Sequence, residues 1–137
     1  MRRSPSNYDM VVILLSRAVE LVEAGKISNA RRALEESIAI ADEIDNIDEK
    51  FSAFIQIART YAMLRDIPKA SEILDSLAEE VEGCDDLRSS LFKILIKVER
   101  LRLGIEDGVN IDKLEEIRSE LRDLFLKTRD VLVARYY

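Results

Sequence analysis

The 137-residue sequence has no histidine and no tryptophan, and only one cysteine, two prolines and four glycines. Histidine is the usual general base and a common metal ligand near neutral pH, so its absence argues against most enzymatic chemistry. The single cysteine, Cys84, excludes an internal disulfide and suits the reducing cytoplasm, where we expect the protein to act. So little glycine and proline leaves few residues for the turns of a β-sheet, and an all-α fold is expected.

The chain also lacks an excess of positive charge and a long apolar run. Its net charge of −6 argues against nucleic-acid binding, which requires a dense positive surface. The longest apolar run, Met10 to Leu15, is too short for a signal-peptide core or a membrane span. The 47% hydrophobic content is sufficient for a single domain over residues 1–137. The absence of histidine and the abundance of Ile, Leu, Glu and Arg suit a heat-adapted organism.

No motif indicates catalysis, a cofactor or a metal. There is neither a glycine-rich phosphate loop nor a dinucleotide fingerprint. Cys84 lies among acidic residues, which disfavour the thiolate and make it a poor nucleophile. The acidic clusters at residues 42–49 and 79–86 lack the spacing of a calcium loop and are expected to be solvated turns. We therefore predict that the protein is not an enzyme and binds no cofactor.

Apolar residues recur with the period of a helix. In the stretch from Phe51 to Ala62 they fall at i, i+3, i+4, i+7, i+10 and i+11, and the stretch from Ile67 to Val81 has a similar pattern. The break at residues 65–68 separates the two stretches, so they predict an antiparallel helical hairpin. Such a hairpin cannot cover its own apolar surface and needs neighbours.

The pattern repeats when the chain is shifted by 40 residues against itself. Val11, Leu14, Leu15 and Ala18 align with Phe51, Phe54, Ile55 and Ala58, and these with Leu91, Ile94, Leu95 and Val98. The second helix of the third unit fits after four extra residues in 104–110. The repeat predicts an α-solenoid of six helices in three hairpins, at about residues 8–44, 47–82 and 86–135.

Polar residues mark where the helices begin. Ser6 with Asp9 forms a predicted capping box, and the other predicted caps are Asn46, Asp66 and either Asp85 or Asp86. The second helix is expected from about Ser28 to about Ile44, and the fifth to end at Gly104. Pro68 fits the first turn of the fourth helix, where its missing amide costs no hydrogen bond.

The middle unit resembles a tetratricopeptide repeat, through Phe54, Ile57, Ala58, Tyr61, Ala70 and Leu74. The first unit matches through Leu14, Ala18, Leu21, Gly25, Ala30 and Leu34, whereas the third departs, with Lys97 and Val98 at motif positions. The period exceeds the family's 34 residues, and the terminal proline is missing. The resemblance implies a scaffold whose first-arm helices line a concave groove for a protein or peptide segment.

The residues that the resemblance places in this groove are mostly apolar. They are Leu15, Val19, Ser52, Ile55, Gln56, Arg59, Met63, Phe92 and Ile96. Leu15 and Val19 occupy positions where carboxylate-binding members of the family carry Lys and Asn, so the groove better suits an amphipathic helix or an extended apolar segment, with Arg59 and Gln56 fixing its register. Alternatively, these residues pack against the chain's own last helix.

Lys93, Lys97 and Arg100 form a positive stripe at i, i+4 and i+7. The stripe either receives an acidic segment of another molecule or is a solvated face.

Two helices carry more apolar residues than one core needs. The first is apolar on more than one face, and the last has a heptad-like seam from Leu114 to Val131. The residues predicted to mediate self-association are Val12, Ile13, Leu121, Leu124, Phe125 and Val131. Two functions remain open, an adaptor for a partner protein and a structural homodimer, and the last helix alternatively folds back as a cap.

Overall fold

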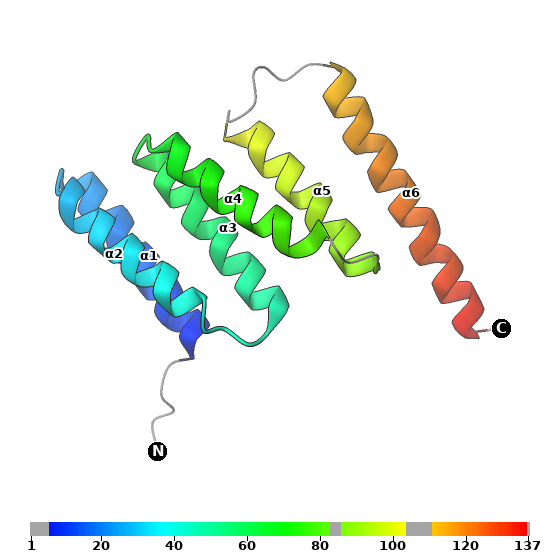
Figure 1. Ribbon diagram of the computed structural model, residues 1–137, viewed down its shortest axis with the longest axis horizontal. Helices are drawn as coiled ribbons and strands as arrows, with labels where there is room; N and C mark the ends of the chain where they lie inside the picture. Colours follow the sequence, from blue (N-terminus) through cyan, green and yellow to red (C-terminus); the bar gives the residue numbers. More distant parts are fainter. Residues whose placement is uncertain (1–5, 83–85, 104–110, 137) are drawn as a thin grey trace. The chain divides into compact units, whose positions relative to one another are not determined.

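The computed structural model describes residues 6–82, 86–103 and 111–136, and in the last range the side chains of residues 112 and 114–128. Every regular element in these ranges is an α-helix, which confirms the all-α prediction (Figure 1). The helices are α1 (Asn7–Glu23), α2 (Ile27–Ala41), α3 (Ile47–Met63), α4 (Ile67–Glu82), α5 (Leu87–Arg102) and α6 (Ile111–Tyr136). The chain forms two compact units, Met1–Leu74 and Asp75–Tyr137, and the boundary falls within α4.

Side-chain caps fix the start of four helices. Ser6, Asn46, Asp66 and Asp86 each accept a hydrogen bond from the backbone amide three residues later, at 2.7 to 3.3 Å. Each cap satisfies one of the amides that a helix leaves without a partner at its start. The predicted caps are confirmed, with Asp86 rather than Asp85 at α5.

The predicted limits of the second helix are wrong by a few residues. It begins at Ile27 without a side-chain cap and ends at Ala41. Beyond it, the amide of Ile44 donates to the carbonyl of Ala41 at 3.1 Å, an i to i−3 bond that tightens the chain into a turn. Ile44 is nevertheless 7% exposed, so the apolar period continues past the end of the helix, and the prediction followed the period.

The turns after α1 and α3 have the same backbone geometry. Gly25 and Arg65, 40 residues apart, both have positive φ, at 76° and 63°. The amide of the next residue donates to a carbonyl five residues back in both turns, from Lys26 to Leu21 and from Asp66 to Tyr61. This pattern is a Schellman motif. The 40-residue repeat is therefore confirmed in the backbone of the first unit.

Small and branched side chains pack α1, α2 and α3 together. The side chains with no exposed surface include Val11, Ala18, Ala30, Leu34, Ile57 and Ala58. Ser37 is equally buried, and its hydroxyl donates to the carbonyl of Leu34 at 2.6 Å. Except for Ile57, which only the family resemblance singled out, the apolar residues of this set belong to the predicted apolar faces, so periodicity located most of this core correctly.

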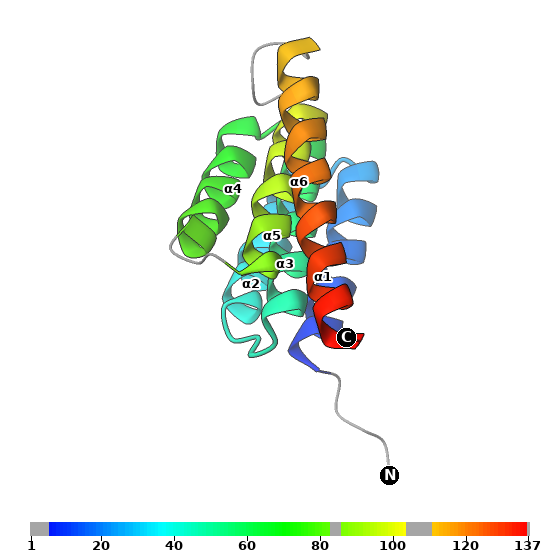
Figure 2. The same cartoon turned by 90° about the vertical axis from the view of Figure 1, so that its right-hand side faces the viewer.

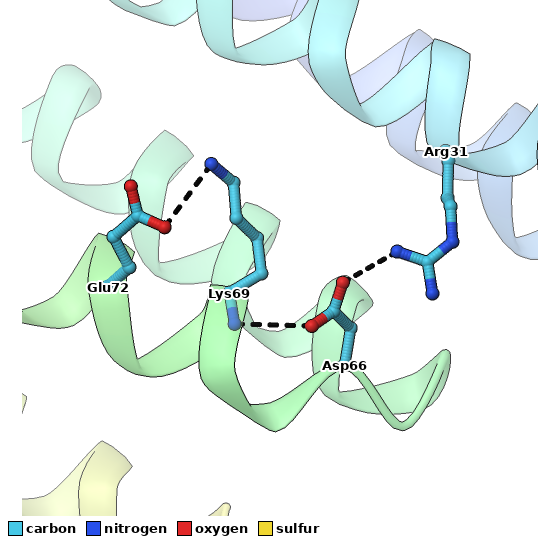
Figure 3. Close-up of polar contacts among 4 residues, drawn as sticks. All are labelled: Arg31, Asp66, Lys69 and Glu72. Atoms are coloured by element: carbon cyan, nitrogen blue, oxygen red, sulfur yellow. Dashed lines mark hydrogen bonds and ion pairs between the residues drawn. The ribbon is translucent and has the colours of Figure 1, made fainter.

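An ion pair joins α2 to the turn before α4. Nη1 of Arg31 lies 2.6 Å from Oδ2 of Asp66, while Oδ1 of Asp66 accepts the amide of Lys69 (Figure 3). Lys69 also pairs with Glu72 at 3.5 Å. The hydrogen bond from Arg31, followed by that from the Lys69 amide, holds the pKa of Asp66 below its usual value, although desolvation opposes this. Asp66 is thus both a helix cap and a link between helices.

Helix α5 buries a different face from the one that the repeat predicts. The 40-residue alignment places Leu91, Leu95 and Val98 at core positions, but these side chains are 40%, 40% and 39% exposed. The buried row lies one residue later, at Phe92, Ile96 and Glu99. Positions one residue apart lie about 100° apart around a helix. Burial of the later row places the ring of Phe92 in the core instead of the side chain of Leu91. The repeat prediction is therefore wrong for these three positions of α5, whereas Ile94, which it also places in the core, is buried.

Candidate functional site

Large apolar side chains remain exposed on two helices of the second unit. On α5 they are Leu91, Leu95 and Val98, at i, i+4 and i+7, and thus on one side of the helix. On α6, Leu114, Leu121 and Phe125 are 48%, 44% and 68% exposed and also share one side. We name these six residues the α5–α6 apolar face. Leu126 is exposed as well, but it lies about 100° further around α6 than Phe125.

The ion pairs between α5 and α6 show that both rows lie on the same side of this hairpin. The two helices are in contact and run antiparallel (Figure 1, Figure 2). Lys97 of α5 binds two carboxylates of α6, those of Glu116, at 3.3 Å, and Glu120. On each helix the apolar row is turned about 100° or more from these charged groups. Viewed from one end of the hairpin, one helix runs toward the viewer and the other runs away, so equal rotations along the two chains have opposite senses. Both apolar rows therefore face one common side of the hairpin, away from the ion pairs.

The charged side of the hairpin faces a cavity of about 550 Å³. Its walls come from α4, α5 and α6 and include Ala78, Glu82, Lys93, Lys97, Asp123 and Lys127. Basic and acidic groups alternate in these walls, so the cavity presents no strong charge of one sign to a ligand. Leu124 lines the same cavity and is half-buried, so this predicted self-association residue does not belong to the exposed face.

The predicted positive stripe binds acidic groups of its own unit. Lys97 binds Glu116 and Glu120, and Arg100 binds Asp75. Burial alone would lower the pKa of Lys97, but the hydrogen bonds and charges of the two glutamates outweigh it and raise that pKa. Lys93 lines the cavity beside them. The stripe therefore holds α4, α5 and α6 together.

The residues predicted to line a groove fall into two groups. Leu15, Ile55, Phe92 and Ile96 are 3 to 8% exposed and therefore contribute to the core rather than to a binding surface. Val19, Ser52, Gln56 and Arg59 are half-buried, and Met63 is 53% exposed.

The polar members of this prediction tie α1 to α3. Nε2 of Gln56 donates to the hydroxyl of Tyr8 and to that of Ser52, both at 3.1 Å. Gln56 therefore has a structural role in the first unit, which reduces its capacity to fix the register of a bound segment.

The predicted self-association residues of α1 are exposed. Ile13 is 60% exposed and Val12 is 37% exposed. Their neighbour Leu14 helps to line a shallow cavity of about 330 Å³ between α1 and α2, whose walls also include Arg17, Leu21, Arg32, Ala33 and Glu36. On α6, Leu121 and Phe125 belong to the apolar face, whereas the side chain of Val131 lies outside the described residues.

Two other kinds of feature are absent from the described part of the chain. Among the described side chains, those of residues 6–82, 86–103, 112 and 114–128, no three acidic or cysteine groups are placed so as to hold a metal ion. Across residues 6–82, 86–103 and 111–136, no helix has the length and apolar character needed to cross a membrane. Cys84 lies outside the described residues.

Sequence reasoning found the residues of the α5–α6 apolar face but assigned them to other roles. It placed Leu91, Leu95 and Val98 among the repeat positions of the core, and Leu121 and Phe125 in a self-association seam. The signal for exposure was the arginine at each end of the first row, Arg88 and Arg102, since a core row seldom begins and ends on a charge.

Comparison with protein-family models, curated proteins and solved structures finds no match to this chain.

Proposed function

We propose that the protein is a non-catalytic, tetratricopeptide-like interaction module of the cytoplasm, and that it holds a helix of a partner protein on the α5–α6 apolar face. The observation that carries the proposal is the exposure of six large apolar side chains, at 39 to 68%, on two adjoining helices. Contiguous apolar surface of this kind is typical of sites that bind another protein. The lack of histidine and the single cysteine support a non-catalytic role in a reducing compartment.

The chemistry of the face suits a helix as its ligand. Two rows of leucine, valine and phenylalanine on adjoining antiparallel helices can pack against the apolar side of a third helix. Covering the exposed half of such a side chain contributes about 1 kcal/mol. Six of them, set against the entropy cost of association, support a weak and reversible complex rather than a permanent one.

The proposal differs from the groove that the resemblance implies. Four of the nine groove residues are buried, and Gln56 is bound to Tyr8. The exposed apolar surface of α5 lies instead at Leu91, Leu95 and Val98. We therefore place the partner on the second unit.

Binding of a synthetic amphipathic peptide with a leucine stripe, measured by fluorescence anisotropy, tests the proposal. Leu95→Asp and Phe125→Asp should each weaken binding at least tenfold while leaving the helical circular dichroism unchanged. Met63→Asp is the matched control, because Met63 is equally exposed but lies on the first unit. Loss of binding in Met63→Asp alone would move the site to α3 and refute the proposal.

Self-association is a second candidate, favoured by Ile13. Its side chain is 60% exposed on α1, the helix that also contributes Leu14 to the 330 Å³ cavity, and a second copy can cover it with the same residue. Light scattering that shows a dimer for the natural protein and a monomer for Ile13→Asp would support this function. A monomer in both cases would exclude it.

A further inference from the structure

Arginine side chains border the α5–α6 apolar face. On α5 the apolar row is preceded by Arg88, three residues before Leu91, and followed by Arg102, four residues after Val98. On α6 the positions next to Phe125 around the helix are those of Arg118 and Arg122. All four arginines are exposed.

The acidic groups of α6 near this face are turned further away from it. Glu116 and Glu120 bind Lys97 on the opposite side of the hairpin, and Asp123 lines the cavity there. Glu115 lies just beyond the arginines around α6, about 100° from the apolar row. The charged side chains nearest to the apolar row of α6 are therefore those of arginines.

On α5 the acidic group nearest to the apolar row is that of Glu99. Its side chain is buried, and its Oε1 lies 3.5 Å from Nη1 of Arg102, so it offsets the charge of that arginine. The positive charge at the rim of the apolar face is therefore carried mainly by Arg118 and Arg122 of α6, although the whole chain carries a net charge of −6.

We propose that the occupant of the α5–α6 apolar face is an amphipathic helix of a partner protein whose apolar stripe is flanked by acidic residues. The inference rests on the proposed function and adds the charge of the ligand. Guanidinium groups bind carboxylates through paired hydrogen bonds, so Arg118 and Arg122 give such a helix its orientation and its preference over a neutral or basic one. The positive rim also speeds the encounter between the two partners.

Three synthetic helical peptides with one leucine stripe test the inference. They differ only in the flanking residues, which are Glu, Gln or Lys, and their binding to the full chain is measured by anisotropy at low and at physiological salt. The Glu-flanked peptide should bind at least tenfold more tightly than the Lys-flanked peptide. The difference should shrink as salt screens the charges.

Charge reversal at the rim gives the matched comparison. The double variant Arg118→Glu/Arg122→Glu should reverse the order of the Glu-flanked and Lys-flanked peptides. The double variant Arg17→Glu/Arg32→Glu changes the net charge equally on exposed side chains of the first unit and should leave the order unchanged. The single variant Arg118→Glu, which should reduce the preference for the Glu-flanked peptide, is the second test if the double variant loses its circular dichroism.

The outcomes separate the two claims. Equal binding of all three peptides would overturn the charge preference while the proposed function stands. Binding of none of them would overturn both. Reversal by the Arg17→Glu/Arg32→Glu variant would show that only net charge matters and would overturn the inference. The inference would also be overturned if the three peptides bound equally and the protein instead bound phosphatidylcholine vesicles containing phosphatidylserine, with Arg118→Glu/Arg122→Glu weakening that binding. The ligand of the face would then be a lipid surface.

Discussion

Two residues at equivalent turns should respond in opposite ways to substitution. Gly25 and Arg65 both have positive φ, at 76° and 63°, and both close the same hydrogen-bonded turn. Glycine adopts this conformation freely, whereas a residue with a Cβ is strained in it by about 1 to 2 kcal/mol. The first repeat therefore has the favourable residue, and the second has the strained one.

The magnitudes follow from the local geometry. A Cβ built on Gly25 meets no atom within 4 Å, so the cost of Gly25→Ala is backbone strain alone. Because alanine also reduces the freedom of the unfolded chain, we expect a net loss of about 1 kcal/mol of stability. Arg65→Gly removes the strain but adds freedom to the unfolded chain, and we expect a gain of about 0.5 kcal/mol.

Urea denaturation followed by circular dichroism measures both effects. Arg32→Gly is the control, because Arg32 is exposed within α2 and glycine there should cost about 1 kcal/mol. If Arg65→Gly destabilised the protein as much as Arg32→Gly does, the shared turn geometry of the two repeats would be refuted.

Three further predictions concern stability. Leu34→Ala should cost about 2 to 5 kcal/mol in urea denaturation, because Leu34 is fully buried, whereas Leu121→Ala, at 44% exposure, should cost less than about 1 kcal/mol. The folded state lowers the pKa of Asp66, so its pair with Arg31 should stabilise the protein at pH values above the unfolded pKa and stop doing so as the pH falls below about 4. Because the pair is exposed, the loss should be no more than about 1 kcal/mol. Asp66→Asn should abolish this acid dependence. The folded state raises the pKa of Lys97, so its contribution should persist below the ordinary value of 10.5 and disappear as the pH rises through the folded value, and Lys97→Met should remove that alkaline step.

Helix positions were predictable because local signals agreed. The caps at Ser6, Asn46 and Asp66, the breaks near Gly25 and Arg65, and the apolar period all point to the same elements. In the first unit, the 40-residue repeat also identifies the core. Sequence was sufficient there because aligned residues of α1 and α3, such as Ala18 and Ala58, are buried in both helices.

The apolar period alone did not settle which face of α5 is exposed, because two apolar rows lie one residue apart. Leu91 and Phe92 are adjacent, as are Leu95 and Ile96, so the period permits burial of either row. Tertiary packing buries the row that contains Phe92 and Glu99. Nothing in the sequence suggests the burial of a glutamate, which here lies 3.5 Å from Arg102.

The partners of Lys97 were equally hidden. The pairing with Glu116 and Glu120 depends on the register of α6 against α5, and these helices are separated by residues 104–110. A sequence repeat does not fix the register of two helices across an insertion of that length. The positive stripe was therefore predicted to be either a site for an external acidic segment or a solvated face, whereas Lys97 and Arg100 bind acidic groups of the chain's own helices.

Methyl NMR of the full chain, labelled at leucine, valine and methionine, tests the central claim most directly. On titration with the Glu-flanked peptide, we expect shifts confined to the methyl groups of Leu91, Leu95, Val98, Leu114 and Leu121. Shifts centred on Val19 and Met63 instead, or no shifts at any peptide concentration, would contradict the assignment of the α5–α6 apolar face as the binding site.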